Sequence, residues 1–146
     1  MKYALIILLW ICATTTQSFA QKWNTDFEKA KAEAMQTDRP ILLVFQGSDW
    51  CAPCIKLERE VWNSPEFADY AKGNLVLLKA DFPKRKKNAL PKAQQEHNKL
   101  LAERYNKNGH FPLVVVLDKN GKTIRSFGYK KVSAKEYIKL IEGGKP

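Results

Sequence analysis

The sequence predicts an α/β fold, in which helices cover both faces of one β-sheet. Residues 41–45 and 113–117 are almost entirely apolar, which is the pattern of strands buried on both faces. Segments whose apolar residues recur at helical spacing lie between these two runs. Asp-Lys-Asn-Gly at 118–121 is typical of a tight turn, so the second run should form a hairpin with residues 122–128. The 146 residues contain no repeat and suffice for one domain with a substantial core.

The first helix is expected over residues 25–36, before the first apolar run. Thr25 and Glu28 have the spacing of a capping box. Asp-Arg-Pro at 38–40 ends this helix. The strand at 41–45 then belongs in the middle of the sheet, because its sequence offers no polar face. The side chains expected on the buried face of the helix are Phe27, Ala30 and Ala34.

Two helices are expected between the first strand and the next. One begins at a pair of cysteines and carries Ile55, Leu57 and Val61 at apolar-periodic positions. The other begins at Ser-Pro-Glu, residues 64–66, where a cap, a proline and an acid stand in the usual order, and Gly73 ends it. Residues 75–80 form the strand that follows.

The C-terminal half contains two more predicted helices. Residues 93–105 have helical spacing at Leu100, Leu101 and Tyr105, and Asn-Gly at 108–109 stops the helix. The last helix is capped by Ser133 and Glu136. Its expected packing residues are Tyr137, Ile138 and Ile141.

Residues 1–20 have the three parts of a secretory signal peptide. Lys2 provides a charged start, residues 3–13 are a short apolar stretch, and Ser-Phe-Ala at 18–20 precedes the expected cut. The apolar stretch is too short to span a bilayer as a helix. Cleavage leaves a domain of residues 21–146 in the periplasm or outside the cell, and removing Lys2 lowers the net charge from +10 to +9.

Two cysteines, Cys51 and Cys54, stand where the first strand gives way to a helix. At this spacing they lie about one turn apart on the same side, which suits a low-strain disulfide. Unpaired N–H groups and the positive end of the helix dipole should stabilise a thiolate at Cys51. Cys51 is therefore the expected exposed nucleophile, and Cys54, one turn deeper, is the resolving thiol. Pro53 fits the first helical turn, where no N–H partner is lost.

Two other uses of such a cysteine pair stay open. Zinc needs four ligands, and besides Cys12, in the segment expected to be removed, only His97 and His110 remain, too far apart to form a matching pair. A purely structural disulfide is the second alternative, although so short a loop contributes little chain entropy in the usual model. In an exported chain that keeps only Cys51 and Cys54, exchange chemistry is favoured over scaffolding.

From about residue 25 to residue 142 the chain resembles the thioredoxin superfamily. The specific motif is Trp-Cys-Ala-Pro-Cys at 50–54 after an apolar strand, and Phe-Pro at 111–112 before a buried strand agrees with it in order and spacing. More narrowly, Gln-Gly-Ser-Asp-Trp-Cys at 46–51 with Leu-Lys-Ala-Asp at 78–81 is similar to secreted thioredoxin-like proteins related to the C-terminal periplasmic domain of the electron transporter DsbD.

The resemblance implies a thioredoxin-like fold, a mixed central sheet sandwiched by helices, with the activity of a thiol–disulfide oxidoreductase. Cys51 and Cys54 would form the redox-active disulfide, with no metal or organic cofactor needed. The bond between Phe111 and Pro112 is expected to be cis. The residues that would shape the groove for a partner's cysteine-bearing segment are Trp50, Ala52, Pro53, Phe111 and Pro112.

The expected partners are protein thiols and disulfides. The chain itself is expected to be a monomer. The Ala-Pro dipeptide between the cysteines resembles reductive members of the family more than the Pro-His oxidant type. Export favours oxidation unless a membrane-embedded electron donor recharges the pair. A measured reduction potential would narrow the direction most, since about 30 mV corresponds to about 1.4 kcal/mol for this two-electron couple.

The sequence departs from the family in its central strand. Thioredoxin carries a buried acid there that helps move protons for the inner cysteine, whereas this chain has Val44 or Phe45, depending on where an extra loop residue is placed. Asp49, Glu58 and Asp81 are candidate replacements, although each is also explained as a surface or turn carboxylate.

Two features near the motif have more than one interpretation. The basic run Lys-Arg-Lys-Lys at 84–87 fits a solvated loop, with contact to an acidic partner or anionic surface as the sharper alternative. No aromatic stacking pattern or nucleic-acid motif accompanies this run in the sequence, so nucleic acid is not an expected partner. His110 fits an exposed loop histidine, and the alternative places it beside the disulfide.

A binding module on the same fold is the rival to an enzyme. Such a module would hold a partner or assist folding, with redox exchange secondary. It would keep full binding after both Cys51 and Cys54 become serine.

We predict that the exported protein begins at Gln21, because the charged, apolar and small-residue parts of residues 1–20 occur in the order that signal peptidase requires. Mass spectrometry of the natively expressed protein checks this. A retained Met1, or a lipidated Cys12 as the first residue, would contradict it; Leu-Trp-Ile at 9–11 lacks the small residue expected before a lipidated cysteine.

Overall fold

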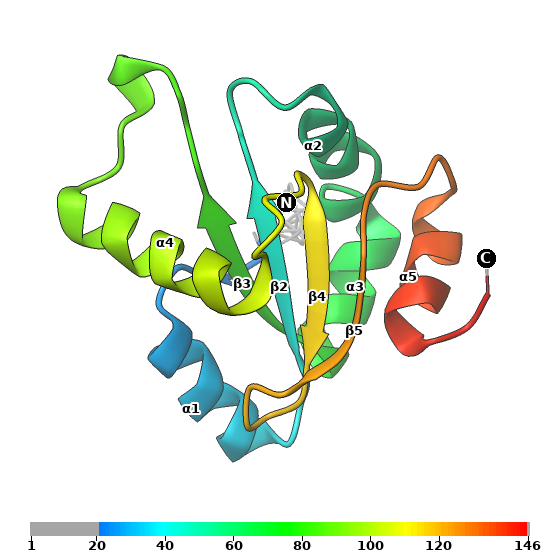
Figure 1. The fold of residues 1–146 in the computed structure, drawn as a ribbon. Coiled ribbons are helices and arrows are strands. Elements are labelled where there is room, and N and C mark those ends of the chain that lie inside the picture. Colours follow the sequence, from blue (N-terminus) through cyan, green and yellow to red (C-terminus); the bar gives the residue numbers. More distant parts are fainter. Residues whose placement is uncertain (1–20, 146) are drawn as a thin grey trace, which may run out of the picture.

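The computed structural model describes residues 21–145, so the predicted cleavage after Ala20 lies outside the described residues. The elements are β1 (Trp23–Asn24), α1 (Phe27–Thr37), β2 (Ile41–Gln46), α2 (Ala52–Leu57), a π-helix (Glu58–Trp62), α3 (Pro65–Asn74), β3 (Val76–Asp81), a 3-10 helix (Lys86–Asn88), α4 (Lys92–Tyr105), β4 (Leu113–Leu117), β5 (Thr123–Phe127) and α5 (Ala134–Glu142) (Figure 1). Within residues 21–145, no helix has the length and apolar character needed to cross a membrane.

The strands form one mixed sheet in the order β1-β3-β2-β4-β5. β3 runs parallel to β1 and to β2, whereas β4 is antiparallel to both β2 and β5. All six residues of β2 are buried, including Gln46, and β2 is the middle strand, as the apolar run at 41–45 predicted. The predicted mixed sheet of thioredoxin type is thereby confirmed.

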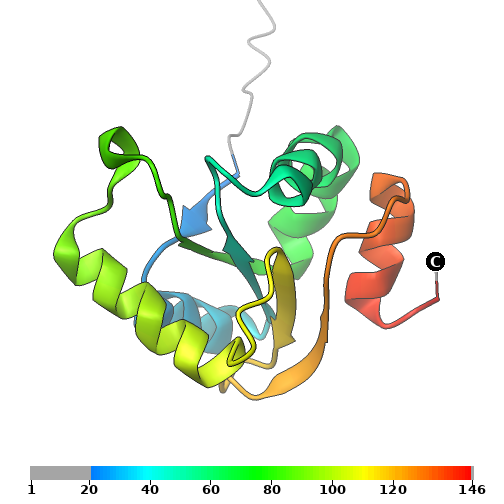
Figure 2. The same cartoon turned by 45° about the horizontal axis from the view of Figure 1, so that its top comes forward.

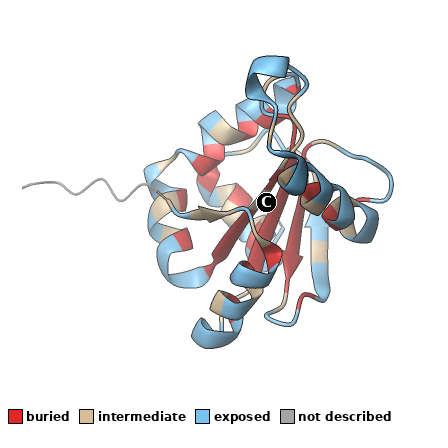
Figure 3. Ribbon diagram, turned by 90° about the vertical axis from the view of Figure 1, so that its left-hand side faces the viewer, coloured by how far each residue is buried: buried red, intermediate tan, exposed pale blue. Residues whose placement is uncertain are grey.

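Helices cover both faces of the sheet, with α1 and α4 on one face and α2, α3 and α5 on the other (Figures 1 and 2). Successive side chains of β2 point to opposite faces. Val44 therefore packs with Leu57 and Trp62 on the α2 side, and Phe45 packs with residues such as Phe27 on the α1 side. Figure 3 shows the result, a sheet whose inner strands are buried, between helices that are exposed on their outer sides.

The first helix begins later than predicted. Asp26, not Thr25, is the N-cap of α1, and its carboxylate accepts a hydrogen bond from the Lys29 N–H at 3.0 Å. Asp26 has the extended backbone that a cap needs, which places Thr25 outside the helix. The predicted buried face is confirmed, because Phe27, Ala30 and Ala34 are all buried.

The other predicted caps are mostly correct. Ser64 caps α3, and Ser133 with Glu136 forms the predicted capping box of α5. Gly73 does not end α3, which continues to Asn74 because the glycine stays helical in its last turn.

Two apolar residues at helical positions do not face the core. Leu100 is 56% exposed and Ile55 is 46% exposed, because α4 and α2 turn Leu101 and Leu57 toward the sheet instead. Strand β1 was not predicted, since its two residues, beginning with Trp23, are too few to show an alternating pattern.

An aromatic cluster joins α5 to the π-helix and α3. The Tyr137 ring lies edge-on to the Trp62 ring at 5.5 Å between centroids, and Trp62 contacts Phe67 at 4.7 Å. Tyr137 is completely buried, and its hydroxyl donates a hydrogen bond to the carbonyl of Gly128 at 3.0 Å. Burial raises the pKa of Tyr137, so the phenol keeps its proton to a higher pH than an exposed tyrosine does.

We predict that Tyr137→Ala lowers the free energy of unfolding by about 3–5 kcal/mol, the range for large-to-small aromatic changes in a core. Tyr137→Phe keeps the ring and removes one hydrogen bond, so it should cost about 1 kcal/mol. Urea unfolding of the two variants measures both values. Equal losses would show that the hydroxyl, and not ring packing, holds α5 in place.

Candidate functional site

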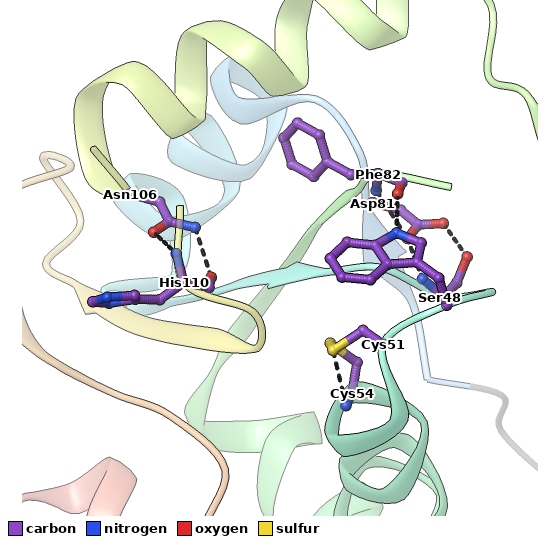
Figure 4. Close-up of a disulfide and its surroundings, with 8 residues drawn as sticks. Ser48, Cys51, Cys54, Asp81, Phe82, Asn106 and His110 are labelled. Carbon is purple, nitrogen blue, oxygen red and sulfur yellow. Dashed lines mark hydrogen bonds between the residues drawn. A yellow bond between two sulfur atoms is a disulfide. The ribbon is translucent and has the colours of Figure 1, made fainter. Parts of the chain in front are cut away.

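Cys51 and Cys54 form a disulfide at the junction between β2 and α2, with an S–S distance of 2.13 Å and a Cα–Cα distance of 5.2 Å (Figure 4). Cys51 is the N-cap of α2, and its Sγ accepts a hydrogen bond from the Cys54 N–H at 3.3 Å. An N–H group that donates to this sulfur is also placed to stabilise a thiolate there once the bond is reduced.

Both cysteines are buried, Cys51 with 4% and Cys54 with 3% of their surface exposed. The prediction that Cys51 is exposed is therefore wrong for the disulfide form. As an N-cap, Cys51 turns its sulfur inward toward the Cys54 N–H, and the bond between the sulfurs removes further surface. Ala52 and Pro53, between the two cysteines, are exposed.

Trp50 forms a platform beside the disulfide. Its indole is 38% exposed, and Nε1 donates a hydrogen bond to the Phe82 carbonyl at 2.7 Å. The Phe111 ring lies edge-on to the Trp50 ring and also to the Phe82 ring, each at 5.4 Å between centroids. These contacts join the cysteine motif to the segment before β4.

Gly47 makes this position of Trp50 possible. A Cβ atom at residue 47 would lie 2.2 Å from Cε2 of Trp50, so only glycine leaves room for the indole. The Gly47 carbonyl accepts hydrogen bonds from the N–H groups of Trp50 and Cys51, at 3.3 and 3.0 Å. One turn therefore sets both the indole and the first cysteine.

The segment before β4 has the predicted backbone. The Phe111–Pro112 peptide bond is cis, as predicted. Phe111 is half-buried and Pro112 is buried, so of this pair Phe111 presents the larger surface.

Asn106 fixes the start of this segment. Its side chain accepts a hydrogen bond from the His110 N–H and donates one to the His110 carbonyl, both at 2.9 Å. The His110 side chain is exposed and points away from the disulfide (Figure 4), which agrees with the loop interpretation.

Two of the three candidate carboxylates accept hydrogen bonds from backbone N–H groups of loops. Asp49 accepts hydrogen bonds from the Lys84 and Arg85 N–H groups, at 2.9 and 3.0 Å, and from the Asn88 side chain at 2.9 Å. The bond from the Lys84 N–H is the main cause of a lowered Asp49 pKa. Asp49 is thus an anchor for the segment at 84–88.

Asp81 has a similar structural task. Its carboxylate accepts from the Ser48 N–H at 2.9 Å, from the Ser48 hydroxyl at 2.6 Å and from the Phe82 N–H at 3.0 Å. These bonds tie the end of β3 to the loop that leads to the cysteines.

Glu58 is the candidate carboxylate that shares a cavity with a cysteine. It lies one helical turn after Cys54, at a spacing that puts two side chains on the same helix face. The Glu58 carboxylate pairs with the Lys79 ammonium at 2.9 Å. The cavity has a volume of about 390 Å³ and is lined by Gln46, Ser48, Cys54, Ile55, Glu58, Arg59, Asn63 and Lys79.

The family's acid position in the central strand is apolar here. Val44 and Phe45 are both buried, and Val44 is the one on the face that α2 covers. Any carboxylate that serves Cys54 must therefore come from elsewhere in the chain, and Glu58 is the candidate that the geometry favours.

Three residues with clear structural roles at the site were missed by sequence reasoning. Phe82 and Gly47 position Trp50, and Asn106 holds the backbone at residue 110. Gly47, directly after the apolar strand and ahead of the cysteines, was a sequence signal that another group lies close to the backbone there. In the described part of the chain, no three His, Cys, Asp or Glu side chains come together as they would to hold a metal ion.

Comparison with known proteins agrees with this geometry. Residues 22–119 match the family described as thioredoxin-like. The disulfide bond reductase DsbH of Chlamydia pneumoniae is 32% identical over 121 residues, which cover 83% of this chain and 70% of that protein. The thioredoxin-related protein DsbJ of the same organism is 29% identical over 106 residues, which are 73% of this chain but 30% of DsbJ.

Solved structures give the same result. A structure of a DsbH oxidoreductase superposes with a TM-score of 0.77 at 31% identity, covering 84% of this chain and 82% of that one. The reduced C-terminal domain of DsbD from Neisseria meningitidis shares the fold, with a TM-score of 0.54 at 24% identity over 81% of this chain and 93% of that domain. The chain therefore belongs to the thioredoxin-like family, and it is a thiol–disulfide oxidoreductase.

Proposed function

We propose that this protein is an exported reductase that opens disulfide bonds in other proteins through Cys51 and Cys54. The observation that carries the proposal is the hydrogen bond from the Cys54 N–H to the Cys51 sulfur, at the helix start beside the Trp50–Phe111 contact. It gives the first sulfur a donor that favours the thiolate, next to surfaces on which a partner's chain can lie. Similarity to a disulfide bond reductase supports the reducing direction.

In the proposed reaction, the reduced protein transfers two electrons to a partner disulfide. The Cys51 thiolate attacks one sulfur of that disulfide, forms a mixed disulfide and releases the other partner sulfur as a thiolate. Cys54 then loses its proton and attacks the Cys51 sulfur. The Cys51–Cys54 disulfide forms, the second partner thiolate leaves and takes up a proton, and the partner is reduced while this protein is oxidised.

The partner's cysteine segment docks in a groove shaped by Trp50, Ala52, Pro53, Phe111 and Pro112. The burial of Cys51 in the disulfide form fits this arrangement, because access to the sulfur is then limited to chains that contact its neighbours. An extended partner segment can lie between the exposed Ala52 and Pro53 and the half-buried Phe111.

Glu58 is the proposed base for the second step. Cys54 must lose a proton before it attacks, and Glu58 is the carboxylate that lines the same cavity. Lys79 holds that carboxylate in place through a bond of 2.9 Å and leaves it 34% exposed, so solvent can carry the proton away.

The proposed reaction consumes electrons, and it takes place outside the cytoplasm. A reductase outside the cytoplasm needs a source of electrons, and we propose a membrane-embedded donor that exchanges disulfides with the same pair. The protein acts as a monomer in the periplasm or outside the cell, after removal of residues 1–20.

We predict different outcomes for the two single cysteine variants. Cys54→Ser leaves the attacking sulfur but removes the resolving one, so mixed disulfides with partner proteins should accumulate on a non-reducing gel. Cys51→Ser should trap almost nothing and should abolish disulfide reduction.

Equal trapping by the two variants would contradict the assigned roles. If neither variant traps a protein and the double variant still binds its partners at full affinity, the reductase proposal fails. The chain would then act as a binding module.

We predict that Glu58→Gln prolongs the mixed disulfide by about tenfold or more, because a positioned general base commonly accelerates proton transfer by about 10²–10⁴. Rapid acid quenching followed by mass analysis measures the lifetime of that intermediate. Glu60→Gln is the matched control, since Glu60 is two residues away and bonds to Tyr129 instead. Equal lifetimes in the two variants would exclude Glu58 as the base.

A further inference from the structure

The basic loop, residues 84–88, lies at the same end of the sheet as the start of α2 (Figures 1 and 2). We propose that this loop recognises acidic residues that flank the reactive cysteine of a partner protein. The inference rests on the proposed reductase function and adds a class of substrate to it, namely proteins whose disulfides lie in acidic segments.

The loop is attached to the cysteine motif through its backbone. Asp49, two residues before Cys51, accepts hydrogen bonds from two backbone N–H groups of the loop, those of Lys84 and Arg85. It also accepts one from the Asn88 side chain, which fixes the far end of the loop. These three bonds set the position of the loop without using any of its cationic groups.

One cation of the loop lies directly on the docking platform. The Lys84 ammonium is 3.9 Å from the centroid of the Trp50 ring, within the range of a cation–π contact. The same indole donates its N–H to the Phe82 carbonyl, two residues before Lys84. The positive charge of the loop therefore begins at the edge of the proposed groove.

The charge of Arg85 is close enough to contribute to the lowered pKa of Asp49, but the two side chains form no ion pair. Arg85, Lys86 and Lys87 are exposed, and among the described residues none of the loop's basic side chains forms an ion pair within 4.0 Å. The neighbouring carboxylates, Asp49 and Asp81, face backbone N–H groups. A loop that only had to remain soluble would not need this attachment, whereas a recognition surface needs charges that are both fixed and unpaired.

The geometry limits where the partner's acids must lie. Exposed charges are screened beyond about 8 Å at physiological ionic strength. An extended chain advances about 3.3 Å per residue, so only acids within about two residues of the partner segment that lies beside Lys84 and Trp50 can feel the loop's charge. A short acidic peptide fits this constraint better than a membrane surface, because the Lys84 ammonium lies on the indole that borders the groove.

The test uses two disulfide-bonded peptides of equal length that differ only in carrying Glu or Gln at two positions beside the cysteines. The rate constant for their reduction by the pre-reduced protein is measured at low and at high salt. We expect the Glu peptide to react about tenfold faster at low salt, and the advantage to fall below about threefold in high salt, as electrostatic steering requires. Equal rates for the two peptides, independent of salt, would overturn the inference while leaving the reductase function intact.

Two double variants distinguish the effect of the loop's lysines from the effect of the protein's net charge. Lys86→Gln with Lys87→Gln should reduce the Glu-peptide advantage to about threefold or less and leave the Gln-peptide rate unchanged. Lys135→Gln with Lys139→Gln removes the same charge from α5, on the other side of the sheet's centre (Figure 1), and should keep the advantage. Equal losses in both would assign the effect to net charge and overturn the inference.

Asp49→Ala tests the attachment itself, because it keeps every cation and removes one anion. If the position of the basic loop matters, the rate advantage of the Glu peptide falls by at least about threefold. If charge alone matters, the advantage is unchanged or rises, which would overturn the role assigned to the anchored loop.

Two further outcomes would also contradict the proposal. Binding to phosphatidylglycerol vesicles that is lost in the Lys86/Lys87 variant, with no preference between the peptides, would assign the loop to a membrane. Failure to reduce either peptide, together with failure on a generic disulfide reagent, would refute the reductase function and the inference with it. Reduction of the generic reagent thus distinguishes the two failures.

Discussion

The burial of β2 on both faces is the constraint on which the site depends. Each large apolar side chain in such a strand contributes about 1.5–3 kcal/mol when it is removed from water, so β2 cannot shift its register without losing most of that stabilisation. The strand ends at Gln46, and the turn at Gly47 follows at once. The position of Cys51 is thus set by the core, although the residue itself lies just past the end of the sheet.

Around this fixed strand end, the chain arranges its carboxylates by task. Asp81 ties the end of β3 to Ser48, and Asp49 ties the basic loop to the motif. Both accept hydrogen bonds from backbone N–H groups of irregular segments, which need acceptors when no ladder supplies them. Glu58 differs, since it is held by the Lys79 side chain and lines the cavity beside Cys54. Three acids close together in the fold therefore have different environments and different uses.

The aromatic residues link chemistry to recognition. Trp50 contacts Phe111, which brings together the cysteine motif and the segment before β4. The same indole carries the Lys84 ammonium on its ring. The apolar ring of Trp50 and the positive charge of Lys84 thus lie together beside the cysteine motif.

The sequence by itself determined the elements that local chemistry specifies. The apolar run of β2, the cap at Ser64, the capping box at Ser133 and the cysteine spacing each depend on residues a few positions apart, and the structure has all of them. The start of α1 was wrong by one residue, because the N-cap is Asp26 and not the predicted Thr25.

Only the tertiary structure decided which distant residues meet at the site. The bonds from Asp49 to residues 84 and 85, the contact of Phe82 with Phe111 and the shared cavity of Glu58 and Cys54 join segments or side chains whose proximity no periodic pattern encodes. The burial of Cys51 also depended on the packed structure, because exposure reflects what surrounds a side chain and not its position in the chain. Local hydrogen bonding and apolar spacing act between neighbours in sequence, whereas these contacts exist only after the sheet has brought its strand ends together.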